Sequence, residues 1–264
     1  MYKTLTAISP ERHAGQLWQG FTSYAFAAGE AVLPLCAAEM PRAVAEMATG
    51  FMRQGEAVSL VALCALTPGQ NLYVGPDGRW LGNYVPAVLR GYPFAVVQRP
   101  EGGEPVVCID EASGLLSETE GEPLFDDTHK PAGKFAQVVD FLTHLERDRK
   151  ITQLLCDLLD RHGLFADWPL KVDAGNGPQD VTGILRIDEA ALNALSAEAF
   201  LELRQAGALP LVYAHLLSTL RLPVLSRLAQ IQAQLTAQLA GQPQTRLEDV
   251  FELPGADDLE FNFD

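Results

Sequence analysis

The first hundred residues place apolar runs between short turn-forming stretches, a pattern typical of β-strands. Residues 58–66 form a continuous apolar run with the length of a buried strand. Residues 71–74 and 79–81 flank a Pro-Asp-Gly turn, which predicts a hairpin. Residues 94–98 and 105–109 flank a Gly-Gly loop and predict a second hairpin. The N-terminal part is therefore expected to hold an antiparallel sheet.

A different pattern, with apolar residues at three- and four-residue steps, begins near residue 134. It predicts one long amphipathic helix over residues 134–162. Gly163 predicts the end of this helix, because glycine readily adopts the positive φ that commonly follows a last helical turn. The apolar positions are Phe135, Val138, Val139, Leu142, Leu145, Ile151, Leu154, Leu155, Leu158 and Leu159.

Beyond the long helix the chain returns briefly to strand-like sequence and then becomes helical. Residues 169–172 and 181–187 predict a strand pair joined by the glycine-rich loop at 175–177. The helical region that follows is expected to be kinked or broken at Pro210 and Pro223, because proline removes a helical hydrogen bond.

These patterns predict an α+β protein with an N-terminal antiparallel sheet and short helices, a long central helix and a helical C-terminal region. Residues 1–112 are expected to form a strand-rich part. Residues 113–133 are polar and rich in turn residues, which predicts a linker or surface loop. Residues 134–246 predict a mainly helical part with a strand pair, and residues 247–264 a tail. All of these can equally belong to one integrated domain.

Charge narrows the classes of function. The chain has 34 acidic and 19 basic residues, a formal net charge of −15. Such a surface repels nucleic acid, whose binding depends on Lys and Arg contacts with phosphates, so we predict no nucleic-acid partner. No signal-peptide pattern and no stretch of roughly 18 apolar residues is visible. We therefore predict no membrane span and a cytoplasmic location.

The cysteines are widely spaced in apolar surroundings. We predict buried, reduced thiols that pack as small hydrophobic side chains. A metal site is not predicted, because zinc ligands usually come in pairs at short spacing. A cofactor is not predicted either, since no glycine-rich phosphate loop follows a strand. The four residues are Cys36, Cys64, Cys108 and Cys156.

Two blocks of sequence carry a family resemblance. The first, residues 70–94, contains Asn-Leu-Tyr-Val, Gly-Arg-Trp and Arg-Gly-Tyr-Pro-Phe. The second, residues 183–218, contains Gly-Ile-Leu-Arg-Ile-Asp-Glu and Tyr-Ala-His-Leu-Leu-Ser. Together they resemble the bacterial SapC family, which is named after a surface-layer-associated protein. The resemblance transfers no catalytic residue. It suggests a flavin-dependent halogenase-like protein as a partner, because such proteins are often encoded near family members.

His215 is the most tempting catalytic candidate. It precedes Ser218 by three residues on a predicted helix, so the two side chains can face the same way. A Ser–His pair can support nucleophilic catalysis. We favour a partly buried histidine with satisfied hydrogen bonds, because no Gly-x-Ser-x-Gly turn and no third member of a triad is visible.

Two Ile-Asp-Glu-Ala segments each place two acids at the end of a predicted strand. They contain Asp110 and Glu111 in one case, and Asp188 and Glu189 in the other. If the two strand ends converge, the four carboxylates would form an acidic site for a hard cation. The simpler interpretation is that Asp188 caps a helix and Glu189 lies in its first turn, where the helix dipole favours an acid.

Arg90 lies between a predicted short helix and a strand. Its guanidinium can bind a carboxylate or phosphate through two parallel hydrogen bonds. It can equally pair with one of the many acids of this chain. Together with His215 and the four carboxylates, Arg90 completes the candidate set for an enzymatic site.

The tail, residues 247–264, alternates acids with aromatic and aliphatic residues. An isolated segment of this composition cannot bury its apolar side chains by itself, so it has to dock. It suits recognition by a groove or as an added strand of a partner. It is equally suited to be a terminal arm tied onto its own sheet. The predicted partner-binding residues are Phe251, Leu259, Phe261 and Phe263.

The first functional hypothesis is a cytoplasmic, SapC-like accessory or binding protein without enzymatic activity that holds a protein partner through the tail. The alternative is an enzyme or metal-dependent modifier whose site includes the two Ile-Asp-Glu segments and His215. A third hypothesis is a surface-layer component, which would require an export route.

Overall fold

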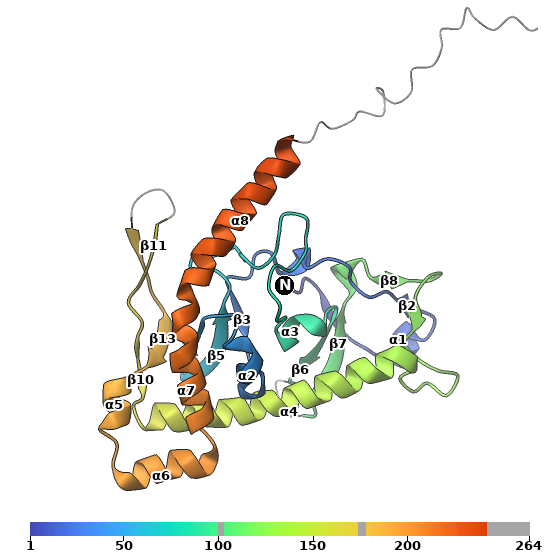
Figure 1. Ribbon diagram of the computed structural model, residues 1–264. Helices are drawn as coiled ribbons and strands as arrows, with labels where there is room; N and C mark the ends of the chain where they lie inside the picture. Colours follow the sequence, from blue (N-terminus) through green and yellow to red (C-terminus); the bar gives the residue numbers. More distant parts are fainter. Residues whose placement is uncertain (100–102, 174–177, 242–264) are drawn as a thin grey trace, which may run out of the picture.

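Two β-sheets lie above one long helix, α4, which runs under both (Figure 1). The computed structural model describes residues 1–99, 103–173 and 178–241. Helix α4 spans Gly133–Arg161. The α+β class predicted from the sequence is confirmed, and so is the long helix.

The larger sheet has five strands in the order β10-β13-β4-β5-β3, and every neighbouring pair is antiparallel. Residues 58–63 of the apolar run predicted as a strand lie in β5, whose alternate residues Val58, Leu60 and Ala62 are fully buried, and residues 64–66 follow the strand. The strands are β3 (Val32–Pro34), β4 (Thr49–Gln54), β5 (Ala57–Leu63), β10 (Phe165–Asp167) and β13 (Ile184–Ile187).

The second sheet has three antiparallel strands in the order β1-β7-β6. Its β6–β7 hairpin is the one predicted at residues 94–98 and 105–109. Strand β1 pairs with β7, so the start of the chain closes one edge of this sheet, while β6 forms the other edge. The strands are β1 (Leu5–Ala7), β6 (Phe94–Val97) and β7 (Val106–Asp110).

The polar segment at 113–133 contains two short strands, β8 (Leu116–Ser117) and β9 (Glu122–Pro123). Both pair with β2 (Leu17–Trp18), and this pairing holds the segment against the N-terminal part of the chain. Gly121 makes the turn between them with φ +127°, and a Cβ atom there would lie 2.5 Å from the carbonyl oxygen of Trp18. The division of the chain into domains stays a prediction.

The hairpin predicted at 71–74 and 79–81 is wrong as a pair of strands. The turn itself forms, because the Gly75 N–H donates to the Arg79 carbonyl, but pairing is reduced to one bridge between Val74 and Trp80. The Asn71 side chain explains the difference. It accepts a hydrogen bond from the Tyr73 N–H and donates one to the Ala27 carbonyl, which holds the backbone in a turn.

The strand pair predicted at 169–172 and 181–187 is split between two sheets. Strand β11 (Leu170–Asp173) pairs with β12 (Pro178–Val181). The residues that follow, 184–187, form β13 and join β4 in the larger sheet. Gly183, with φ +84°, makes the bend between β12 and β13. The predicted loop at 175–177 lies outside the described residues.

Helix α4 ends as predicted, with Gly163 at φ +66° just beyond its last turn. Its inner face differs from the predicted stripe in the C-terminal half. Ile151 and Leu154 are 46% and 69% exposed, whereas Thr152, Leu155 and Cys156 face the core. The outer face of the helix therefore carries two large aliphatic side chains.

Most of the other helices are short. Pro210 lies in the first turn of α7 and Pro223 in the first turn of α8, and the helical region is interrupted at both places as predicted. A 3-10 turn at Thr219–Arg221 joins α7 to α8. The helices are α1 (Pro10–His13), α2 (Met40–Ala43), α3 (Ala87–Arg90), α5 (Glu189–Asn193), α6 (Ala197–Ala206), α7 (Leu209–Ser218) and α8 (Leu222–Gly241).

The run from Leu209 to Leu239 is long and apolar enough, by length and composition, to cross a membrane. Only 28% of its most apolar 18-residue window is buried. The α7 half of this run is fastened to the larger sheet by the hydrogen bonds described below, so a span through α7 would have to break them. The absence of a membrane span stays a prediction.

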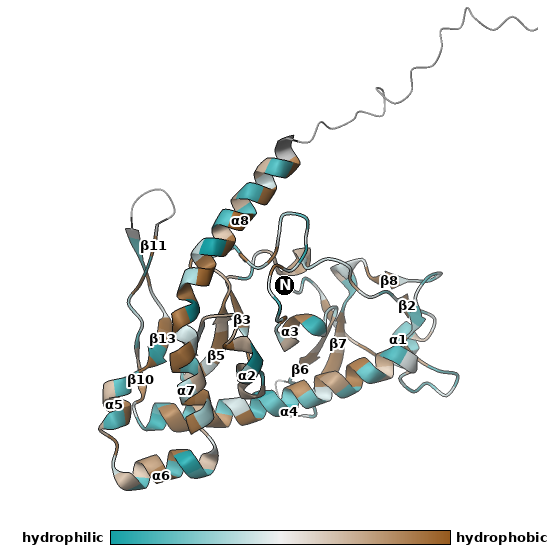
Figure 2. Cartoon of the chain, viewed as in Figure 1, coloured by the Kyte–Doolittle hydropathy of each residue, from teal (hydrophilic) through white to brown (hydrophobic). Residues whose placement is uncertain are grey.

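Two apolar clusters make up the core. The larger lies between the five-stranded sheet, the C-terminal half of α4 and α7. The smaller joins Trp18, Phe94 and Ile109 to Phe135 and Leu142 of α4. Figure 2 shows the sheet strands as mainly hydrophobic and α4 as alternating between the two classes. All four cysteines are free and buried, as predicted.

Candidate functional site: a cleft between two sheet edges

His215 and Ser218 lie on the buried face of α7, against β4 and β13. The Ile187 N–H donates to Nε2 of His215 at 3.2 Å, so the ring proton has to be on Nδ1. Nδ1 lies 3.4 Å from Oγ1 of Thr49, which it meets as a donor. The Thr49 hydroxyl then donates to Ser218 Oγ at 2.7 Å, and Ser218 donates to the His215 carbonyl oxygen at 2.7 Å.

This network gives each participating ring nitrogen and hydroxyl a partner. Burial lowers the pKa of His215 to about 4, which keeps the ring neutral at pH 7. Ser218 Oγ is hydrogen-bonded to Thr49 and to the backbone, not to the imidazole. The arrangement therefore suits a link between helix and sheet better than an activated nucleophile.

The first pair of acids lies in the three-stranded sheet. Asp110 is fully buried and accepts hydrogen bonds from the N–H groups of Lys3, Thr4 and Ala112. Glu111 forms two hydrogen bonds of 2.8 Å with the Arg12 guanidinium, which lowers the pKa of Glu111. Asp110 thus joins β1 to the end of β7.

The second pair of acids lies in the five-stranded sheet. Asp188 caps α5 by accepting hydrogen bonds from the N–H groups of Ala190 and Ala191, as predicted, and Glu189 lies in the first turn. The two pairs of acids therefore follow strands of different sheets. Among the described residues, no group of three or more His, Cys, Asp or Glu side chains is placed to hold a metal ion.

Arg90, at the end of α3, places its guanidinium over the ring of Phe141 on α4, 5.4 Å from the ring centroid. This is a cation–π contact between a short helix and the long one. The structure thus distributes His215, Arg90 and the two acidic pairs over separate parts of the fold. The predicted partner-binding residues Phe251, Leu259, Phe261 and Phe263 lie outside the described residues.

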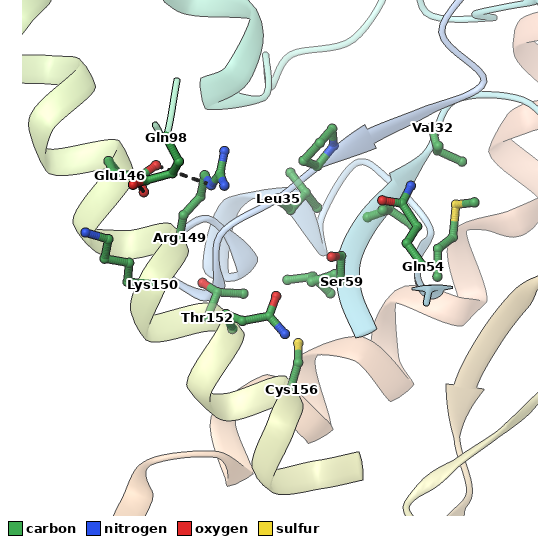
Figure 3. A pocket seen from close by; sticks show the side chains of 15 residues that line it. Val32, Leu35, Gln54, Ser59, Gln98, Glu146, Arg149, Lys150, Thr152 and Cys156 are labelled. Atoms are coloured by element: carbon green, nitrogen blue, oxygen red, sulfur yellow. Dashed lines mark hydrogen bonds and ion pairs between the residues drawn. The ribbon is translucent and has the colours of Figure 1, made fainter. Parts of the chain in front are cut away.

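A concave surface lies elsewhere, between the two sheets and above α4. It consists of two adjoining hollows of about 460 and 220 Å³. Four residues line both hollows, so we treat them as one site, the edge cleft: Pro34, Leu35, Glu146 and Arg149. Figure 3 shows the larger hollow, with side chains of α4 on one side and those of β3 and β5 on the other.

The two walls of the edge cleft are sheet edges. Strand β3 is the last strand of the five-stranded sheet, and β6 is the last strand of the three-stranded sheet. Residues of β3 line both hollows, and the whole of β6 lines the smaller one. Two open strand edges thus border the same cleft, with α4 as its floor.

On β6, Val96 directs both backbone polar groups into the cleft. The Asp110 N–H donates to the Pro93 carbonyl, and in an antiparallel ladder alternate residues face the same side. The backbone N–H and C=O groups of Phe94 and Val96 therefore point away from β7. Phe94 is satisfied, because its N–H donates to the Gly91 carbonyl and its own carbonyl accepts from the Tyr2 hydroxyl. Val96 has no second neighbouring strand within the described part of the chain.

The polar side chains of the edge cleft gather on α4. Glu146 is buried and accepts a hydrogen bond of 2.6 Å from the Gln98 side-chain amide. Its other oxygen lies 3.4 Å from Nε of Arg149 (Figure 3). Lys150 lines the larger hollow beside them. The remaining lining is mainly apolar, so at α4 the cleft combines an apolar surface with two cations and the paired carboxylate of Glu146.

A second buried carboxylate, Glu39, lies at the wall of the smaller hollow. It accepts hydrogen bonds from the Tyr84 hydroxyl at 2.6 Å, the Ala87 N–H at 2.7 Å and the Cys36 N–H at 2.8 Å. Burial, together with the hydrogen bond to Glu39, raises the pKa of Tyr84, and burial raises the pKa of the Cys36 thiol to about 12. Cys36 is therefore a protonated thiol at neutral pH.

Our sequence reasoning did not single out Glu39, Glu146 or Arg149. One signal was available for Arg149, which falls on the stripe of α4 that runs from Leu142 and Leu145 to Thr152. A charged residue on an otherwise apolar helix face indicates a polar site or a rim. The sequence holds no comparable signal that the edge strands β3 and β6 border the same cleft.

Comparison with known proteins agrees with the motif blocks. The SapC family model matches residues 8–225, which include the five-stranded sheet, strands β6 and β7 of the second sheet, α4 and α7. The match ends within α8, before the tail. No curated protein and no solved structure matches the chain significantly. Because the family match covers most of its length, the protein belongs to the SapC family.

Proposed function

We propose that this SapC-family protein is a cytoplasmic accessory protein without enzymatic activity, which holds a protein partner through its acidic–aromatic tail. The observation that carries this proposal is the position of α8. The helix extends beyond the body of the protein (Figure 1), and residues 242–264 follow it in the sequence. A C-terminal segment that starts at the end of such an arm is well placed to meet a second protein.

The sequence of α8 is consistent with a helix whose exposed surface contacts a partner protein. From Leu228 to Gly241 the helix has no charged residue, although the chain as a whole carries a net charge of −15. Leu239, near its end, is 48% exposed. An uncharged helix surface with an exposed leucine is more favourable to bury against a partner than a charged one, because no ion has to be desolvated.

The tail supplies recognition chemistry. Its last 17 residues, 248–264, hold seven acidic side chains and no basic one. Four of its apolar residues, Phe251, Leu259, Phe261 and Phe263, give it anchors that gain free energy on burial. A fitting partner has an apolar groove bordered by Lys and Arg. A flavin-dependent halogenase-like protein is the candidate suggested by family context.

The absence of enzymatic activity is proposed because of what the candidate residues already do. His215 and Ser218 bind strands of the sheet, Asp110 joins β1 to β7, and Asp188 caps α5. A catalytic group needs a free lone pair or an exchangeable proton in reach of a substrate. The lone pairs and protons of these four side chains are directed at backbone groups or at the Thr49 hydroxyl.

The test is an affinity purification from the native cell with three baits. They are the full-length protein, a chain that ends at Gly241 and keeps α8, and a full-length variant in which Phe251, Leu259, Phe261 and Phe263 are replaced by Ser. We expect a specific partner with the first bait and its loss with the other two. Equal recovery by all three baits would contradict a role for the tail.

The same cells test location. We expect the protein in the soluble cytoplasmic fraction after gentle lysis. Recovery in the cell envelope or at the cell surface would contradict the cytoplasmic proposal and favour a surface-layer component.

A further inference from the structure

The edge cleft offers hydrogen-bonding groups to an extended chain. Val96 of β6 presents one N–H and one C=O to it, as the pairing with β7 requires. Val96 also packs with its side chain on the apolar cluster beside Leu142 and Leu145. An added strand next to β6 would therefore gain backbone hydrogen bonds and an apolar surface together.

Strand β6 is a better acceptor of an added strand than β3, the other wall. On β3 the Leu35 N–H donates to the Leu60 carbonyl, so Val32 and Pro34 are the residues that face the cleft. Pro34 has no N–H to offer, and proline on an edge strand opposes pairing. Of the two strand edges that border the cleft, β6 can therefore pair with an added strand, whereas Pro34 opposes such pairing on β3.

The end of the tail has the pattern of such a strand. Residues 259–264 read Leu-Glu-Phe-Asn-Phe-Asp, so that apolar and polar residues alternate strictly. In a β-strand, alternate side chains point to opposite faces. One face of this segment would be wholly apolar, and the other would be acidic or amide.

Charge favours the same pairing. Arg149 and Lys150 lie at the α4 floor of the edge cleft, where Glu146 accepts a hydrogen bond from Gln98 and is paired with Arg149. The tail brings an excess of carboxylates to these two cations. Attraction between them is long-ranged at low salt and weakens as salt is added.

The segment that separates α8 from residue 259 is long compared with α8 itself. The 17 residues from 242 to 258 can extend to about 56 Å at ~3.3 Å per residue, whereas the 20-residue helix α8 is ~30 Å long. Covalent attachment also raises the effective concentration of the segment near its own cleft to the millimolar range. Reach and effective concentration both favour the cleft of the same molecule.

We propose that, in the absence of a partner, residues 259–264 bind in the edge cleft of their own chain as a strand added to β6. Leu259, Phe261 and Phe263 face Leu142 and Leu145 of α4, and the Val96 backbone forms the hydrogen bonds. This docking involves the same tail as the proposed function, but the observations that support it come from the edge cleft. It gives the tail a resting position from which a partner has to displace it.

The test is residue-resolved amide hydrogen exchange by NMR on the purified full-length protein without a partner. The two samples are the natural sequence and a Phe261→Ser, Phe263→Ser variant. We expect the Val96 amide to exchange at least about tenfold more slowly in the natural sequence, because it is hydrogen-bonded to the added strand. The Val97 amide faces β7 and should exchange equally in both samples.

Two further full-length variants complete the experiment. A Phe251→Ser variant changes an aromatic residue of the tail outside the docked segment, and it should retain the protection of Val96. An Arg149→Gln, Lys150→Gln variant should lower the protection, as should added salt in the natural sequence.

Each remaining outcome overturns the proposal. Equal Val96 exchange in the natural and the Phe261→Ser, Phe263→Ser proteins would show that the segment does not occupy the cleft. Protection that disappears on tenfold dilution, together with a dimer by light scattering, would assign the segment to the cleft of a second copy. A failed affinity purification bears only on the proposed function, since no partner is present here.

Discussion

His215 and Thr49 are separated by 166 residues in the sequence, and Nδ1 of the histidine lies 3.4 Å from the threonine hydroxyl. The other ring nitrogen accepts the Ile187 N–H. One neutral imidazole thus links α7 to two neighbouring strands, β4 and β13. This explains why a histidine inside a conspicuous sequence motif is fully buried.

Replacing His215 by Ala is expected to lower the free energy of unfolding by about 2–4 kcal/mol, because it leaves the Ile187 N–H unsatisfied and opens a cavity. Tyr213→Ala is the matched control, since Tyr213 lies on the exposed side of the same helix. We expect a change within about 0.5 kcal/mol for it. Urea unfolding measures both, and equal effects would contradict the linking role.

The stability of the protein should fall as the pH decreases from about 6.5 towards 4. Burial lowers the pKa of His215 from 6.5 to about 4, so within this window the unfolded chain binds more protons than the folded one. Stability therefore rises with pH across the window. The contribution of the neutral ring is complete above pH 6.5, and about 3 kcal/mol of it is lost by pH 4.

Urea unfolding at several pH values tests this dependence. A His215→Gln variant cannot titrate and should show a shallower slope between pH 4 and 6.5 than the natural protein. His144→Gln makes the same substitution at an exposed histidine on α4 and is the matched control. Identical slopes in all three proteins would show that His215 does not titrate in this range.

Glu39→Gln should destabilise the protein by about 2–3 kcal/mol, although it changes only one atom. Both carboxylate oxygens accept hydrogen bonds from Cys36, Tyr84 and Ala87, so the amide group of Gln would face a donor. Glu46→Gln is the control, because a single Asn83 amide contacts one oxygen there at the surface. Thermal unfolding by circular dichroism should separate the two variants by several degrees.

The two Ile-Asp-Glu segments should respond differently to the same substitution. Asp110 accepts hydrogen bonds with both oxygens while fully buried, so Asp110→Asn is expected to cost about 2–3 kcal/mol. Asp188 uses one oxygen to cap α5, and Asn is an equally good N-cap, so Asp188→Asn should cost less than about 0.5 kcal/mol. Equal costs in urea unfolding would contradict these assignments.

The local periodicity of the chain was enough to predict several elements. The apolar spacing of residues 134–162 predicts α4, and Gly163 ends it because glycine tolerates the required positive φ. The hairpin of β6 and β7 and the cap at Asp188 were predicted in the same way. In each case the determining contacts join residues close in the sequence.

Periodicity was less successful where apolar residues follow one another closely. Ile151 and Leu154 have the spacing of buried positions on α4, yet the core of the larger sheet meets Thr152, Leu155 and Cys156. Which side of a helix is buried depends on the elements that cover it. The Thr152 hydroxyl accepts the Ala37 N–H, a contact that only the packed fold creates.

By itself the sequence determined the family, the α+β class, the long helix and the chemical character of the tail, because these depend on residue types and their local spacing. The tertiary structure alone decided that β13 pairs with β4, that His215 is a neutral link, and that β3 and β6 border one cleft above α4. Strand partners and facing edges are set by contacts between residues far apart in the chain, and a buried hydrogen bond has no signature until both partners are placed.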